Sequence, residues 1–372
     1  MSKRALIVSM SLGGGHRRAG ESVAAALEEL GGGWEARCID LSDYVARWFR
    51  AGYVAAYLFV IRHAPWVWGW LYRRPPRPQG GTLPPWLLRR ALTPYARLLE
   101  QTQPHAVLAT QITGSEATSL LRARGLYRGP AATVVTDFDS HPAWRASEID
   151  RFFVPDETIR QEFIEAGIPA ERLEATGVPV APAFAGPFDV PALKAKHGIR
   201  PRVPVGLLMG GSLGLGPLAE AVEKLLAIAP ACELLVVAGH NRRLRRRLER
   251  IAAPEHSRLR VFGFVDYVAE LMAVADLFVS KPGGLSMTEA LALGLPTLTF
   301  APLPGQEVAN ARHLAAKGLV KAVPEGESLA QAAVALLEDE AERRRLAEAA
   351  RAYARPHAAR HIAGRLVELA DR

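Results

Sequence analysis

Short runs of apolar and β-branched residues alternate with longer stretches of helical periodicity along the chain. In the first half, such runs predict buried strands at Ala5–Ser9, Glu35–Asp40, Ala106–Thr110 and Ala132–Val135. After Pro179 a second series predicts strands at Val205–Met209, Leu234–Ala238, Leu259–Phe264, Leu277–Ser280 and Thr297–Phe300. Strands that alternate with helices form parallel sheets covered on both faces. The two series therefore predict an α/β protein with two doubly wound, Rossmann-like domains.

The domain boundary is expected in Gly177–Pro191, because its prolines and glycines continue neither a helix nor a strand. We therefore predict an N-terminal domain over residues 1–180 and a C-terminal domain over residues 181–356. A second proline- and glycine-rich segment, Pro75–Pro85, lies inside the first series of strands. It predicts a loop rather than a boundary.

The composition is that of a globular protein. Of the 372 residues, 49% are hydrophobic and 23% are charged, which is enough material for two cores. The two cysteines, Cys38 and Cys232, lie too far apart in sequence for a disulfide framework or a Cys-x-x-Cys metal site, and this favours a reducing compartment. The N-terminal apolar run is too short for a signal peptide, and no run of about 18 apolar residues predicts a membrane-spanning helix.

The formal net charge of +8 suits an anionic partner, such as nucleic acid, an anionic membrane or a phosphorylated substrate, although an arginine-rich composition alone also produces it. The most basic run is Arg242–Arg250. Its leucines, Leu244 and Leu248, are spaced to lie on one side of a helix, which predicts a solvated basic face on the other. No aromatic residues are interleaved with these arginines, so nucleic acid is not the expected partner.

An aromatic segment runs from Trp48 to Arg74 and is flanked by arginines. Arg62, His63 and Pro65 divide it into two pieces that are too short to span a bilayer. Aromatic rings beside arginines suit the headgroup layer of a membrane. We therefore expect a membrane-facing surface that includes Trp66, Trp68 and Trp70. The alternative is a helix pair packed on the first sheet, and one segment can do both.

Each series of strands opens with a glycine-rich turn. Ser11–His16 follows the first strand, and Met209–Gly216 follows the first strand of the second series. Glycines allow a sharp turn and the close approach of a ligand, and the amides at the start of the following helix attract anions. The first turn lacks the G-x-G-x-x-G pattern of dinucleotide sites, and a plain strand-to-helix turn is the alternative. The residues of interest in these turns are Gly14, Gly15, His16, Gly211 and Ser212.

A third glycine turn, Ser280–Glu289, also joins a predicted strand to a predicted helix. Its amides are suited to hold a diphosphate without a metal ion. Glu289 has two interpretations: a carboxylate that binds a ribose diol, or the second half of a capping box with Ser286. Further along, Gln306 and Glu307 offer polar groups for sugar hydroxyls, unless they belong to an ordinary exposed loop.

A candidate for general-base chemistry follows the strand Ala132–Val135. The segment Asp137-Phe-Asp-Ser-His141-Pro-Ala-Trp144 places carboxylates and a histidine at the carboxyl end of that strand. Ordinary turn chemistry is the alternative, because Asp and Ser are common in loops. A divalent metal at the Asp-x-Asp pair is not favoured, because the glycine turns already supply diphosphate neutralisation.

These motifs together are familiar. Over nearly its whole length the chain resembles the monogalactosyldiacylglycerol synthase and processive diacylglycerol glucosyltransferase family, and more distantly the MurG-type transferases. The resemblance is carried by Gly13-Gly14-Gly15-His16, Thr136-Asp137-Phe138 with His141 and Trp144, Thr176-Gly177-Val178-Pro179-Val180, Gly210-Gly211-Ser212-Leu213-Gly214, Ala238-Gly239-His240-Asn241, Gly263-Phe264-Val265, Lys281–Ala290 and Pro304-Gly305-Gln306-Glu307.

The resemblance implies the GT-B architecture, in which two nucleotide-fold domains face a cleft and a C-terminal helix, here residues 357–372, packs back on the first domain. It implies an inverting transferase that uses UDP-glucose or UDP-galactose and needs no cofactor or metal. The expected donor-binding residues are Gly211 and Ser212 near the diphosphate or sugar, Phe264 and Val265 around the uracil, Gly284, Leu285 and Ser286 at phosphate, Glu289 at the ribose, and Gln306 and Glu307 at the hexose.

For the acceptor side, the resemblance implies that the N-terminal domain holds diacylglycerol. Asp137 is the expected base, and His16 is its expected proton partner. Gly14, Gly15, His141 and Trp144 are expected near the acceptor or membrane. We therefore expect a peripheral enzyme at the cytoplasmic face of the cell membrane. The alternatives are a transferase for a polyprenyl-linked cell-wall precursor, a UDP-sugar 2-epimerase of the same fold, and a basic protein that binds membrane or RNA without catalysis.

Overall fold

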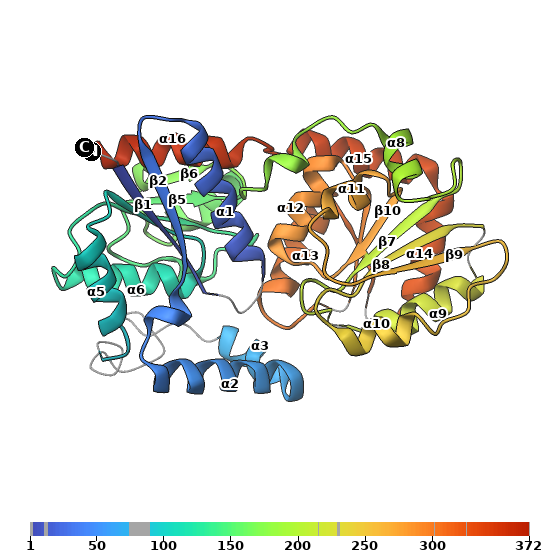
Figure 1. Ribbon diagram of the computed structural model, residues 1–372, viewed down its shortest axis with the longest axis horizontal. Helices are drawn as coiled ribbons and strands as arrows, with labels where there is room; N and C mark the ends of the chain where they lie inside the picture. The colour runs from blue at the N-terminus through green and yellow to red at the C-terminus, as the bar shows by residue number, and fades with distance from the viewer. Residues whose placement is uncertain are drawn as a thin grey trace. The chain divides into compact units, whose positions relative to one another are not determined.

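The computed structural model describes residues 3–10, 14–73, 90–214, 216–228, 231–300, 302–324 and 326–371 (Figure 1). The loop predicted at Pro75–Pro85 lies outside these residues. The chain divides into two compact units. The first contains Met1–Ala181, Pro304–Gln306 and Arg355–Arg372, and the second contains Pro182–Leu303 and Glu307–Ala354. The break at Ala181 lies in the proline- and glycine-rich stretch that separates the two series of strands.

The first unit is built on a six-stranded sheet with the strand order β2-β1-β3-β4-β5-β6, and every pairing is parallel. The strands are β1 Lys3–Ser9, β2 Trp34–Asp40, β3 Ala106–Ala109, β4 Ala131–Val134, β5 Arg151–Val154 and β6 Leu173–Ala175. The four predicted strands are confirmed. The last two were missed because β5 has only three apolar residues and β6 carries Glu174 in its middle.

Helices cover both faces of this sheet (Figure 1). The described helices of this unit are α1 Gly14–Glu29, α2 Arg47–His63, α3 Pro65–Arg73, α5 Thr93–Thr102, α6 Ile112–Ala123, α7 Glu157–Glu165 and α16 Ala358–Ala370, with 3-10 turns at Leu41–Tyr44, Pro142–Trp144 and Ala170–Arg172. Of these, α2 and α3 lie apart from the sheet (Figure 1). Local sequence explains several starts. The side chain of Gln111 accepts the Thr113 amide at the start of α6, and Asp156 accepts the Ile159 amide at the start of α7.

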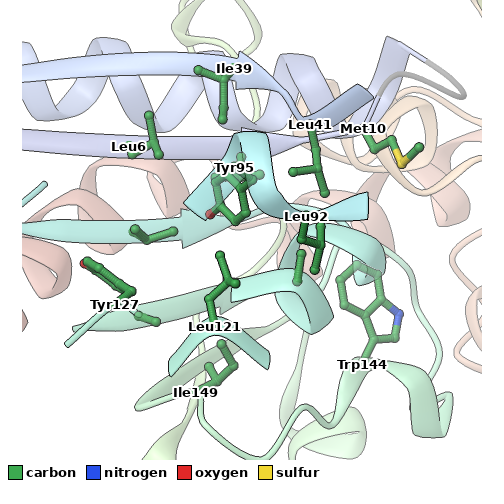
Figure 2. Close-up of a cluster of buried hydrophobic side chains, with 14 of the residues drawn as sticks. Leu6, Met10, Ile39, Leu41, Leu92, Tyr95, Leu121, Tyr127, Trp144 and Ile149 are labelled. Carbon is green, nitrogen blue, oxygen red and sulfur yellow. The ribbon is translucent and has the colours of Figure 1, made fainter. Parts of the chain in front are cut away.

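Successive side chains of β1 point to opposite faces of the sheet, so the core of this unit has two layers, one on each face. Ala5 and Ile7 belong to one layer, and Leu6 and Val8 belong to the other. The second layer contains Tyr95 and the other side chains drawn in Figure 2. The first layer is completed by the apolar face of α16, where Ile362, Ala363 and Leu366 are fully buried. The C-terminal helix therefore packs on α1 and on the sheet of the first unit.

The second unit has its own parallel six-stranded sheet, with the order β12-β11-β10-β7-β8-β9. The strands are β7 Val205–Met209, β8 Glu233–Val237, β9 Arg258–Phe262, β10 Leu277–Ser280, β11 Thr297–Thr299 and β12 Lys321–Ala322. The five predicted strands are confirmed within a residue or two. The edge strand β12 was missed because it has only two residues, and both are exposed.

The helices of this unit are α8 Val190–Lys196, α9 Leu218–Ile228, α10 Arg242–Leu248, α11 Val268–Ala273, α12 Gly284–Leu293, α13 Gln306–Ala316, α14 Leu329–Glu338 and α15 Glu340–Tyr353, with a 3-10 turn at Pro182–Phe184. The first residue of α13 is grouped with the first unit. Among the described residues, no helix is both long enough and apolar enough to cross a membrane.

Each sheet has one place where ligands are expected. In the first unit β1 lies between β2 and β3, and in the second unit β7 lies between β8 and β10. On one side of this central strand the next strands are added toward one edge of the sheet, and on the other side they are added toward the opposite edge. The loops at the carboxyl ends of the two neighbouring strands therefore run in opposite directions and leave room for a ligand. The glycine turns singled out in the sequence follow β1, β7 and β10.

Candidate functional site

In the first unit, His16 and Asp137 lie together at the carboxyl ends of the strands. His16 is in the first turn of α1, and its Nδ1 is 2.7 Å from the Thr136 hydroxyl oxygen. The same hydroxyl lies 3.3 Å from the Thr110 carbonyl, to which it can also donate. The Thr110 hydroxyl in turn donates to the His16 carbonyl at 2.8 Å, which ties the turn after β1 to the end of β3.

The electrostatics of this site favour a neutral imidazole. Burial lowers the pKa of His16, and the nearby Asp137 carboxylate opposes that effect without overcoming it. Asp137 itself is only 8% exposed. A neutral imidazole beside a carboxylate provides two groups that can accept a proton, which suits general-base chemistry.

The loop after β4 is held by a residue that sequence reasoning did not single out. The Tyr72 hydroxyl, at the end of α3, donates to Asp139 Oδ2 at 2.5 Å. Its ring stacks on His141 with centroids 4.0 Å apart, and its carbonyl accepts from His141 Nε2 at 2.7 Å. His141 lies four residues after Asp137 in this loop, and its Nε2 is already hydrogen-bonded to protein. In the sequence, Tyr72 was only one aromatic residue among many in its segment.

Trp144 requires a correction. Its side chain was expected near the acceptor or membrane, but it is fully buried in the core layer shown in Figure 2. The 3-10 turn Pro142–Trp144 packs against α6 and directs the indole inward. Trp144 therefore anchors the loop after β4 in the core of the first unit and is not exposed to lipid.

The aromatic helix α3 has two different faces. Trp66 is 71% exposed and Trp70 is 46% exposed, which fits the expected membrane-facing surface. Trp68 is half-buried, and its Nε1 donates to Gln306 Oε1 at 3.0 Å within the first unit. Trp68 is therefore less exposed than Trp66 and Trp70, and its contact with a membrane stays a prediction. The Gln306 amide, expected at the hexose, is held by this indole.

In the second unit, two loops support each other beside β7. Gly211 and Gly214 have φ values of +71° and +55°, which favour glycine. A side chain on Gly214 would collide with the Ala238 carbonyl. The amide of His240, after β8, donates to the Ser212 carbonyl at 2.9 Å. The predicted residues Gly211 and Ser212 therefore lie on a turn that is fixed from the neighbouring strand.

Phe264 and Val265 lie in the loop after β9. Val265 is buried, whereas Phe264 is 46% exposed, and its ring stacks on His240 with centroids 4.3 Å apart and planes inclined by 12°. The pair presents a flat aromatic surface at the edge of the glycine turn. His240 was named in the sequence motif without a role, and the stacking is a contact that the motif did not predict.

The start of α12 decides between the two interpretations of Glu289. The N-cap is Gly283, which makes no side-chain cap hydrogen bond, and the helix begins at Gly284. Ser286 is therefore the third helical residue and not an N-cap, so the capping box is wrong. Glu289 is only 3% exposed, one turn further along the helix. The amides of Gly284, Leu285 and Ser286 form the first turn of a helix that has no side-chain cap.

A buried lysine next to this turn was also missed. Lys281 is 7% exposed, and its Nζ is 3.1 Å from Glu307 Oε2. The same carboxylate oxygen accepts from the Leu303 amide at 2.6 Å. The Cδ of Lys281 lies 3.8 Å from the position that a Cβ on Gly216 would occupy, so the stem of this lysine packs near the glycine turn after β7. Glu307, expected at the hexose, is engaged by this cation.

No group of three or more His, Cys, Asp or Glu side chains in the described part of the chain is arranged to hold a metal ion. Independence from metal remains a prediction, which chelation tests directly.

Two family models match different parts of the chain. Residues 16–180 match the family model described as monogalactosyldiacylglycerol synthase, and residues 214–353 match the model for glycosyl transferases group 1. The chain is 32% identical over 240 residues to a processive diacylglycerol beta-glucosyltransferase of Bacillus cytotoxicus and 30% identical to one of Bacillus thuringiensis. Each alignment covers 64% of this chain and 62% of the relative, so the match spans less than two thirds of the relatives' length.

Solved structures show the fold. Acinetobacter baumannii MurG superposes with a TM-score of 0.64 at 17% identity, and the match covers 98% of this chain and 99% of MurG. The UDP-GlcNAc 2-epimerase of Neisseria meningitidis, solved with UDP-GlcNAc, has a TM-score of 0.64 at 15% identity over 99% of this chain and 100% of its own. The chain therefore has the GT-B fold, and it is similar to monogalactosyldiacylglycerol synthases over residues 16–180 and to group 1 glycosyl transferases over residues 214–353.

Proposed function

We propose that this protein is an inverting glycosyltransferase that moves glucose or galactose from a UDP-sugar to diacylglycerol, to make a membrane glycolipid. The observation that carries the proposal is the start of α12. There, uncapped helix amides lie beside the buried Lys281 and are followed by the buried carboxylate of Glu289. Such an arrangement suits a nucleoside diphosphate, with the phosphates at the amides and the ribose at the carboxylate. The family matches of the two domains support the same assignment.

In the proposed reaction the acceptor hydroxyl oxygen attacks the anomeric carbon from the face opposite UDP. The bond from that carbon to the acceptor oxygen forms as the bond to the UDP oxygen breaks. Asp137 accepts the hydroxyl proton, and the neutral His16 lies beside it to share or pass on that proton. The charge that develops on UDP is stabilised by the α12 amides and by Lys281, with no cofactor or metal ion.

We further propose a peripheral enzyme at the cytoplasmic face of an anionic membrane. The exposed rings of Trp66 and Trp70 on α3 supply an interfacial aromatic surface, and the net charge of +8 supplies electrostatic attraction to anionic lipid. Nucleic acid is not part of this proposal.

The direct test is incubation with phosphatidylglycerol vesicles that contain diacylglycerol and with labelled UDP-glucose or UDP-galactose. We expect a labelled glycolipid from one of the two donors, and we expect the same rate when EDTA is added. Vesicles that carry a polyprenyl-linked sugar, and an assay for a free epimerised UDP-sugar, test the two alternative enzyme functions. Product only in one of those assays would replace the proposal, and loss of turnover on chelation with recovery on Mn²⁺ would refute its metal-free step.

Glu289→Ala is expected to weaken UDP binding by about 10- to 100-fold, because a hydrogen bond to a charged group contributes roughly 1.5–3 kcal/mol. Titration calorimetry with UDP measures this effect. Glu289→Gln keeps the shape and should lose part of the affinity. A lower melting temperature in both variants with unchanged UDP affinity would assign Glu289 to the fold and not to the ribose.

A further inference from the structure

One residue of α3 reaches the loop that carries Asp137. Three separate groups of Tyr72 contact that loop: the hydroxyl donates to Asp139 at 2.5 Å, the ring stacks on His141 at 4.0 Å, and the carbonyl accepts from His141 Nε2 at 2.7 Å. His141 Nδ1 is also occupied, because it accepts the Ala143 amide at 3.2 Å. The two partners of Tyr72 lie two and four residues after Asp137. The side chain and the backbone of this one residue of α3 therefore both contact the loop.

The phenol of Tyr72 is a permanent donor. Its pKa is raised far above the usual range, first by burial and then by the Asp139 and Asp137 carboxylates. The hydroxyl therefore stays protonated at any working pH. The effect of Asp137 on this phenol also shows that Tyr72 is within electrostatic reach of the proposed base.

The opposite face of α3 points away from this loop. Trp66 and Trp70 are four residues apart and exposed, whereas Trp68 and Tyr72 are four residues apart and contact protein. Residues four apart share a face of a helix, so α3 has one exposed aromatic face and one face bound to the unit. With only nine residues, α3 is too short to hold its own geometry in water, and its contacts must hold it.

We propose that Tyr72 is a positioning residue that couples the seating of α3 at a lipid surface to the placement of Asp137. This inference rests on the proposed function. When Trp66 and Trp70 enter the headgroup layer, α3 is held more firmly, and through Tyr72 the segment from Asp137 to His141 is held with it. The carboxylate is then fixed where a lipid hydroxyl arrives. Away from a membrane, the same segment is held less firmly.

Tyr72→Phe removes the hydroxyl and keeps the ring stack, and Tyr72→Leu removes both. Tyr44→Phe is the matched control, because it removes the hydroxyl that accepts from Arg37 at 2.9 Å in the same unit, away from Asp137. With vesicles that contain diacylglycerol, we expect kcat to fall about tenfold in Tyr72→Phe, as for one lost hydrogen bond to a charged group, and further in Tyr72→Leu. The KM for the UDP-sugar and the melting shift caused by UDP should not change. The inference is overturned if Tyr72→Phe has the same kcat as the wild-type protein, or if Tyr44→Phe loses as much kcat as Tyr72→Phe does.

Hydrogen exchange gives a readout that does not depend on catalysis. In the wild-type protein, phosphatidylglycerol vesicles should slow amide exchange in residues 137–141, and in Tyr72→Leu they should not, although both proteins float with the vesicles. Trp66→Ser with Trp70→Ser should abolish the slowing together with flotation. Equal slowing in wild type and Tyr72→Leu, or none in wild type, refutes the coupling. If the wild type makes no glycolipid while the exchange result holds, the proposed function fails and the positioning role of Tyr72 stands.

Discussion

Replacing Asp137 with Asn is expected to reduce glycosyl transfer by about 10²- to 10⁴-fold, which is the usual contribution of a general base. Asn has the same shape as Asp and keeps the loop after β4 filled, but its amide cannot accept a proton from the attacking hydroxyl. Asp137 is buried next to a neutral His16, so solvent does not readily replace it as the proton acceptor. The loss should appear in kcat, because the proton moves only as the new bond forms.

The measurement is transfer to diacylglycerol in vesicles, with UDP binding followed in parallel by the UDP-induced shift in melting temperature. UDP binding should be unchanged, because Lys281, Glu289 and the first amides of α12, which are proposed to bind UDP, belong to the second unit. Asp43→Asn is a suitable control, since Asp43 is exposed and only pairs with Arg50 at 2.8 Å. Full turnover in Asp137→Asn would remove this carboxylate from the mechanism. If His16→Gln abolished transfer in that case, Nε2 of His16 would be the base instead.

The strands and the first part of the site could be predicted because their signals are local. Apolar runs bounded by turn residues define β1, β4, β7 and β10, and parallel sheets place the ends of such strands at one edge. The pairing of His16 with Asp137 was expected from the family resemblance, and β3 lies between the strands that precede them. The Thr110 and Thr136 hydroxyls, which bridge that gap, are ordinary residues with no distinctive pattern.

The contacts that were missed join residues far apart in the chain. Tyr72 and Asp139 are separated by 67 positions, and no period or motif records such a pair. Lys281 and Glu307 likewise belong to different turns, and each has a plausible role by itself. The direction of a side chain out of a short turn is equally hidden in sequence, which explains why Trp144 was expected at the surface. The capping box failed for a different reason. Its spacing is satisfied inside α12, but the helix already begins at Gly284, so Ser286 is not in the capping position.

Replacing Glu233 with Gln is expected to destabilise the second unit by about 3–5 kcal/mol, which lowers its melting temperature by roughly 6–20 °C. Glu233 is completely buried at the start of β8, where Arg200 Nε lies 2.6 Å from one carboxylate oxygen and Arg260 Nε lies 3.3 Å from the other. The Arg200 amide also donates to the carboxylate at 3.3 Å. Gln offers one oxygen and no charge, so two guanidinium groups would lose the anion that offsets their desolvation.

The positions of the tryptophans allow the unfolding of the second unit to be measured separately from that of the first. All seven tryptophans precede residue 150, so their fluorescence reports on the first unit, whereas far-ultraviolet circular dichroism reports on both. In Glu233→Gln the circular dichroism transition should acquire an earlier step while the fluorescence transition stays in place. Glu270→Gln is the control, because its pairs with Lys196 and His197 are partly solvated and such pairs contribute about 0–1 kcal/mol. If Glu233→Gln unfolds at the same temperature as the wild-type protein, the two arginines reach water when the anion is removed. A simultaneous shift of the fluorescence transition would mean instead that the two units unfold as one.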